Sequence, residues 1–176
     1  MTVLRAWEPQ VVYGPFQTSE YAEALMRIQR PIFSDARIAE AVAARMQRQE
    51  ILDRDDPAPP LIHAVLGEAV LRRNVGGKEA MQNQLDHLLA MADRLRITLQ
   101  VVTAPRNEEA GLFGALTIAS FNGSPDTAFL DTVMSGDYVS DGEQITQLNV
   151  LYDRVLQEAS SPKESRKLIM ELRDEL

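Results

Sequence analysis

The fold is decided by residues 61–103, which read LIHAVLGEAVLRRNVGGKEAMQNQLDHLLAMADRLRITLQVVT. Residues 61–71 are apolar on both faces, which predicts a central strand with a bend at Gly67. Residues 78–95 place apolar side chains three and four positions apart, and this spacing predicts an amphipathic helix. Residues 97–103 predict a second strand, so the strand-helix-strand order favours a parallel pair.

Upstream of this unit, the sequence predicts two helices, over residues 19–29 and 35–52. Thr18 or Ser19 can cap the first helix, and Ser34 or Asp35 the second. The first helix ends before a proline at position 31, and residues 53–60 (DRDDPAPP) form a loop because their prolines and aspartates break regular structure.

Downstream, residues 112–121 and 127–133 predict two strands that reverse at Asn122-Gly123. A short extended segment at 138–139 follows, and then come two helices, over 143–159 and from 161 to the end. We therefore expect one α+β domain over residues 1–176, with a mixed, largely antiparallel sheet of about four strands packed with amphipathic helices. The expected order is α-α-β-α-β-β-β-α-α.

Composition excludes several classes of function. Eighteen basic residues stand against 26 acidic ones, and a net charge of −8 does not attract a phosphate backbone, so we expect no direct nucleic-acid binding. The absence of cysteine excludes disulfides and thiolate chemistry, and the two histidines have no metal-site spacing, so no metal and no cofactor is expected. No signal peptide or membrane-spanning run is visible, which predicts a cytoplasmic protein.

Glu68 is the most unusual position, because alternation along the expected strand puts its carboxylate on an apolar face. One interpretation is a ligand contact or a general acid; the other is an ion pair with an arginine of a packed helix, such as Arg45. Asp131, on the 127–133 strand, is a second catalytic candidate, since it would complete an acid/base pair if the fold placed it beside Glu68. The catalytic residues are otherwise unknown, because no nucleophile motif is present.

Arginines supply further ligand-binding candidates. Arg45, Arg48 and Gln49 lie within little more than one helical turn and can grip an anion, or form a solvated helix face. Arg72, just before a Gly-Gly turn and a helix start, is a further candidate for anion binding.

Phe16, Gln17 and Tyr21 lie where the first helix begins. They can line a cleft, because an aromatic ring with a polar tip suits such a position, or they can belong to the core.

Five motifs resemble one known family. YGPFQTSEYA at 13–22 is similar to its PGLLQTEEYA, and ARMQRQEIL at 44–52 to its ARxxRQxxL. GEAVLRRNVGG at 67–77, QLDHLL at 84–89 and SSPKESR at 160–166 resemble its EAxLRRxVGG, QLxxLL and LSPEESRxLI. The chain thus resembles, over 12–176, the C-terminal domain of XRE-type, WhiJ-like and antitoxin-like transcriptional regulators of actinobacteria.

This resemblance implies a domain that receives a signal from a small molecule or a small regulatory protein. Two departures stand out: Gly-Pro-Phe replaces Pro-Gly-Leu-Leu, and no helix-turn-helix precedes the match. We therefore expect a ligand- or partner-sensing module without a DNA-binding domain. The alternatives are a stand-alone enzyme of natural-product biosynthesis, of cyclase or isomerase type, and a protein-interaction module that dimerises or binds a small acidic or basic partner.

Overall fold

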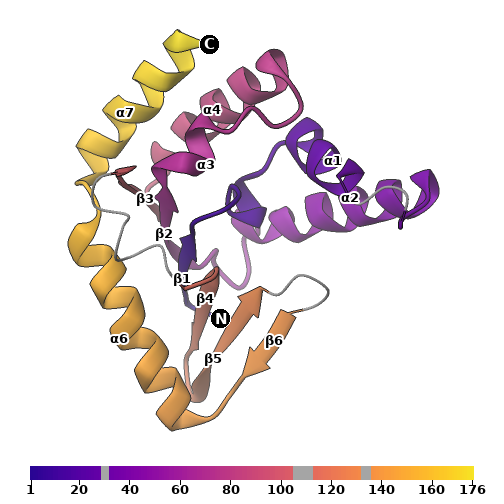
Figure 1. The fold of residues 1–176 in the computed structure, drawn as a ribbon. Coiled ribbons are helices and arrows are strands. Elements are labelled where there is room, and N and C mark those ends of the chain that lie inside the picture. The colour runs from indigo at the N-terminus through magenta and orange to yellow at the C-terminus, as the bar shows by residue number, and fades with distance from the viewer. Residues whose placement is uncertain (29–31, 105–112, 132–135) are drawn as a thin grey trace.

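The computed structural model describes residues 1–28, 32–104, 113–131 and 136–176. In this part of the chain, six α-helices pack on one six-stranded mixed sheet with the strand order β3-β2-β1-β4-β5-β6 (Figure 1). The α+β class and the mixed sheet are confirmed. The expectation of about four strands was wrong, because the first strand was missed and the short 138–139 segment belongs to a paired strand. The expected order α-α-β-α-β-β-β-α-α was wrong as well, because β1 precedes the first helix and the short helix α3 follows β2.

Three parallel strands form one half of the sheet. β1 (Val3–Glu8) pairs with β2 (Leu61–Gly67), and β2 pairs with β3 (Ile97–Val102). The parallel pair expected from the strand-helix-strand unit is therefore confirmed. β1 was missed because its six residues, VLRAWE, include two charged ones and form no apolar run, although the strand lies in the centre of the sheet.

Three antiparallel strands form the other half. β4 (Leu116–Phe121) pairs with β1, β5 (Ser124–Asp131) with β4, and β6 (Gly136–Val139) with β5. The predicted reversal at Asn122-Gly123 is confirmed, and Gly123 has a φ of 76°, which favours glycine. The strand predicted over 127–133 begins earlier, at Ser124, and its positions 132 and 133 lie outside the described residues, as does position 112 of the other strand.

The strand predicted over 61–71 is half strand and half helix. β2 ends at Gly67, whose extended backbone caps the short helix α3 (Glu68–Arg72). The apolar residues after Gly67 are buried through helical geometry, so the two-residue alternation used to place Glu68 does not apply beyond Gly67.

The remaining helices begin close to the predicted positions, and side chains cap the first turn of four of them. Thr18, Ser34, Asp141 and Ser161 each accept a hydrogen bond from a backbone N–H of the first turn, and Ser161 forms a capping box with Glu164. The helices are α1 (Ser19–Arg27), α2 (Asp35–Gln49) followed by the 3₁₀ turn η2 (Glu50–Leu52), α4 (Lys78–Ala92), α6 (Gly142–Glu158) and α7 (Pro162–Glu175).

The sheet carries a separate core on each face. On one face, α4, α7 and the segment 12–21, which contains the 3₁₀ turn η1 (Gly14–Phe16), cover the parallel strands. On the other face, α6 packs on the centre of the sheet around Trp7 and Tyr152. Figure 1 shows α6 and α7 following one another along one side of the molecule, with α1 and α2 on the opposite side.

Candidate functional site

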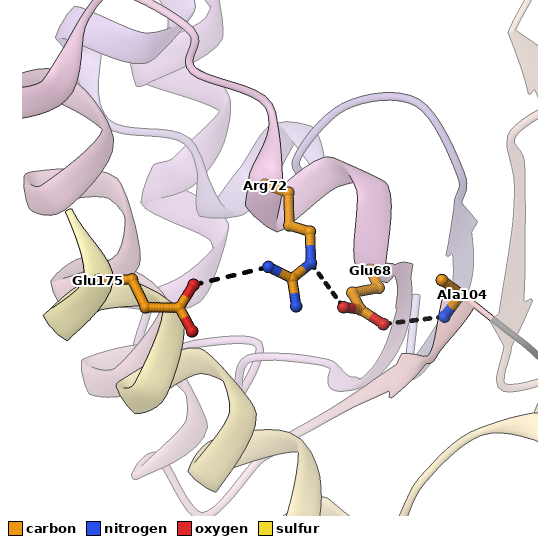
Figure 2. A network of polar contacts seen from close by, with 4 residues as sticks. All are labelled: Glu68, Arg72, Ala104 and Glu175. Carbon is orange, nitrogen blue, oxygen red and sulfur yellow. Dashed lines mark hydrogen bonds and ion pairs between the residues drawn. The ribbon is translucent and has the colours of Figure 1, made fainter.

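Glu68 is part of a network that ties three elements together (Figure 2). Its carboxylate accepts hydrogen bonds from Arg72 Nε, at 2.6 Å, and from the backbone N–H of Ala104, at 2.8 Å. Arg72 Nη1 also forms an ion pair with Glu175 Oε2 of α7, at 3.6 Å. Burial opposes ionisation, but the hydrogen bond from Ala104 and the contact with Arg72 outweigh it, so the pKa of Glu68 lies below its usual value.

Two expectations about Glu68 are corrected by this geometry. Its partner is Arg72, four residues along the same short helix, and not Arg45. Both carboxylate oxygens are satisfied, which suits a structural tie between α3 and the end of β3 and does not suit a general acid. Arg72 is exposed and engaged with two carboxylates.

Glu68→Ala is expected to lower the free energy of unfolding by about 2 kcal/mol, since the Ala104 N–H loses the charged acceptor that the buried Glu68 side chain supplies. Because the pKa of Glu68 is lower in the folded chain than in the unfolded chain, Glu68 stabilises the fold at pH values above the ordinary carboxyl pKa. This stabilisation is lost as pH falls through the lower pKa of the folded state. Urea unfolding at pH 7 and pH 3 measures this. Glu68→Gln, which keeps an acceptor for Ala104, is the matched control and should lose less; equal losses, or none, would contradict the assignment.

A second group of polar side chains gathers at the carboxyl end of β1, where the chain turns through η1 into α1. Arg45 Nη1 of α2 donates to Gln17 Oε1 at 2.7 Å, and Gln17 Nε2 donates to the Val12 carbonyl at 2.5 Å. Gln49 Nε2, one turn further along α2, donates to the carbonyls of Gly14 and Gln17. These bonds fix α2 against the turn.

Residues 16–18, where η1 leads into α1, are also held by hydrogen bonds from α4. Gln84, which is fully buried, donates to the Phe16 carbonyl and accepts from the Thr18 N–H, both at 2.8 Å. The Tyr21 hydroxyl accepts from the Val12 N–H at 3.2 Å. The structure therefore brings together five of the predicted ligand residues. These are Phe16, Gln17, Tyr21, Arg45 and Gln49; Phe16 and Tyr21 are buried in the core.

The central residue of this site, Glu8, was missed by sequence reasoning. Glu8 ends β1 and is only 5% exposed, and its Oε2 has no hydrogen-bond partner among the described residues. Burial raises the pKa of its carboxyl from 4.5 to about 8; Asp131 adds to the rise and Arg45 opposes it. The carboxyl is therefore protonated at neutral pH.

Arg45 is the cation of the site. Its side chain is half-buried, and no carboxylate forms an ion pair with it within the described ranges. Burial, and then the neighbouring Arg48, lower the pKa of Arg45, whereas Asp131 and Glu8 raise it. A guanidinium remains charged under such a shift. Arg48 itself is exposed, and its Nε bonds to the Ala44 carbonyl of the same helix.

The antiparallel half of the sheet extends the site. Ala6 pairs with Thr117, Thr117 with Phe129, and Phe129 with Tyr138, so these side chains form a row on the face that carries Glu8. Exposure rises along the row from 0% at Ala6 to 40% at Phe129 and 70% at Tyr138. The buried cluster thus continues into an exposed aromatic surface.

Asp131 joins this site and not the Glu68 network. It lies two residues beyond Phe129, so it shares the face of that row, and it acts electrostatically on Glu8 and Arg45. The possible pairing with Glu68 is replaced by one with Glu8. We call Glu8, Tyr13, Gln17, Arg45 and Asp131 the β1 site; Tyr13 belongs to it because burial and then Glu8 raise the pKa of its phenol, which also interacts with Thr117.

Two kinds of feature are absent from the described residues. No group of three or more His, Asp or Glu side chains in them is arranged to hold a metal ion. None of the helices in the described part of the chain has both the length and the apolar character needed to cross a bilayer.

These features define an α+β domain with a polar cluster at the junction of the parallel and antiparallel halves of its sheet. Residues 2–171 match the family described as "Domain of unknown function (DUF5753)", and the chain belongs to this family. No curated protein and no solved structure matches the chain.

Proposed function

We propose that the chain is a small-molecule-binding module and that its ligand occupies the β1 site. The single observation behind this proposal is Glu8: a buried carboxyl with an unpartnered oxygen is costly to fold and is explained if a ligand supplies the missing hydrogen bond. The half-buried, unpaired Arg45 and the exposed Phe129 and Tyr138 support the same proposal.

The motifs described above suggest a biological setting for such a module. Their similarity to the C-terminal domain of actinobacterial XRE-type regulators supports a sensing role, in which ligand occupancy is reported to another protein. The module would act in the cytoplasm without contacting DNA itself, in keeping with its net charge of −8. A small regulatory protein, or a second copy of the chain, is the proposed receiver of the signal.

A screen of cellular metabolites by thermal shift, with mass spectrometry of the bound compound, tests the proposal. We expect at least one compound to raise the melting temperature and to be recovered intact; at one hundred times its Kd the stabilisation is about 2.7 kcal/mol. The stabilisation should disappear in Arg45→Gln and persist in Arg37→Gln, an exposed arginine of the same helix that stacks on Phe33. A stabilising compound that is indifferent to Arg45→Gln, or the lack of any, would refute the proposal.

An enzyme is the second candidate function, and Glu8 with Asp131 favours it. A neutral buried carboxyl close to a second carboxyl is an arrangement that acid/base catalysts use. The same screen separates the two functions: an enzyme of cyclase or isomerase type would return the bound compound chemically altered, whereas a sensor returns it unchanged.

A further inference from the structure

The charges of the β1 site differ from those of the chain as a whole. Although the chain has a net charge of −8, Arg45 and Arg48 stand three residues apart on α2 without an ion pair to any described carboxylate. Glu8 contributes no charge in its protonated form, which leaves Asp131 as the acid acting on Arg45. When the adjoining Arg48 is counted with the site, two positive charges stand against one negative charge.

The hydrogen bonds of Arg45 leave part of its guanidinium available. Arg45 Nη1 donates a hydrogen bond to Gln17 Oε1, and the amide nitrogen of Gln17 donates in turn to the Val12 carbonyl. The orientation of the guanidinium is therefore set from one side, and its other N–H groups have no partner among the described residues. A fork held in this way matches the two oxygens of a carboxylate.

Glu8 and the aromatic row supply the other two contacts. A protonated carboxyl can donate one hydrogen bond, and Oε2 of Glu8 has no described partner, so a carbonyl or hydroxyl oxygen of a ligand that accepted this hydrogen bond would satisfy the group. Phe129 and Tyr138 lie side by side in the β5–β6 register and offer exposed ring surface on the same face. Such a surface suits a flat apolar body.

We propose that the ligand of the β1 site is a singly charged aromatic carboxylate, held by a charge-assisted hydrogen bond from Arg45, with an acceptor oxygen at Glu8 and its ring against Phe129 and Tyr138. This inference rests on the proposed function and adds the chemical class of the ligand. The single balancing charge of the site favours a monoanion over a phosphate dianion.

NMR titration of the full chain with matched probes tests the ligand class. The probes are benzoate, 4-hydroxybenzoate, benzamide, benzylamine and phenyl phosphate, followed through the Arg45 Nε–H and the backbone amides of Glu8 and Phe129. We expect 4-hydroxybenzoate and benzoate to bind saturably, and benzamide, benzylamine and phenyl phosphate about tenfold or more weakly. Arg45→Gln should weaken benzoate binding by about tenfold, and the control Arg37→Gln should leave it unchanged.

The outcomes distinguish the ligand class from the proposed function. If benzamide, benzylamine or phenyl phosphate binds at these residues as tightly as benzoate, the aromatic monocarboxylate is wrong but the site remains a ligand site. Benzoate binding that ignores Arg45→Gln also overturns the ligand class. Should no probe shift the Arg45, Glu8 or Phe129 signals, the ligand class is refuted, and the metabolite screen then decides the proposed function separately. A folded Arg45→Lys variant, which keeps the charge but loses the fork, guards against misfolding of Arg45→Gln.

Discussion

Glu8→Gln is expected to stabilise the protein at pH 8 by about 4 kcal/mol and to leave its stability nearly unchanged at pH 4.5. The carboxyl has a pKa of about 8 in the folded chain against 4.5 ordinarily, because it is buried and lies near Asp131, with Arg45 opposing. The folded state therefore holds a proton that the unfolded state has lost between these pH values. Stability is fully present below pH 4.5 and falls as pH rises to about 8.

The measurement is urea unfolding of the wild type and of Glu8→Gln across pH 4.5 to 8.5. The two curves should meet at the acid end and diverge with a slope that approaches one proton per molecule. Glu40→Gln, an exposed carboxyl of α2, is the matched control and should change stability by no more than about 0.5 kcal/mol. Parallel curves for wild type and Glu8→Gln would show that Glu8 is ionised in the folded protein.

The same titration bears on ligand binding. As Glu8 ionises above pH 8, it stops donating a hydrogen bond and adds a negative charge beside Arg45 and Asp131. Tyr13, whose phenol pKa is raised by burial and by Glu8, stays neutral in this range. An anionic ligand should therefore bind more weakly at alkaline pH in the wild type than in Glu8→Gln.

The second large effect is expected from Gln84→Leu, which should lower the free energy of unfolding by about 3 kcal/mol. The substitution keeps the approximate size of the side chain but removes the partners of two backbone groups, the Phe16 carbonyl and the Thr18 N–H. Each unsatisfied buried group costs about 1–3 kcal/mol. Because these bonds hold the turn that carries Gln17, binding at the β1 site should weaken as well.

Gln82→Leu is the matched control for this prediction. Gln82 lies on the same helix, is partly exposed and makes no side-chain hydrogen bond to a described residue, so its replacement should be close to neutral. Thermal unfolding with calorimetry compares the two variants. Similar small losses for both would mean that Gln84 does not hold the turn.

The elements that were predicted correctly are those whose cause is local. α4 follows from its apolar spacing, and α1, α2, α6 and α7 begin where a Thr, Ser or Asp side chain can cap them. The reversal at Gly123 likewise depends on one residue pair. Such signals lie within a few residues of the structure they determine, so the sequence displays them directly.

The predictions failed where the local structure depends on residues far away in the sequence. β1 is a strand because β2 and β4 pair with it on either side, and the segment VLRAWE contains no pattern that predicts a strand. Glu68 was placed by strand alternation, but the chain becomes helical at that residue. Arg45 was named as a ligand candidate from helical spacing and Gln17 from its place at the start of the first helix. Glu8 was missed because its burial depends on segments far along the chain.

The central place of β1 also constrains the order in which the protein can form. Hydrogen bonds join Thr2 to Ser120, 118 positions away, while the other edge of β1 is filled by β2. During synthesis, β1 can pair with β2 once residues 61–67 have been made, but its other edge has no partner until residues 116–121 of β4 have been made. The last-made half of the sheet therefore completes the environment of the first-made strand, and the protein is expected to acquire both its stability and its β1 site only after synthesis has passed the β4–β5 hairpin.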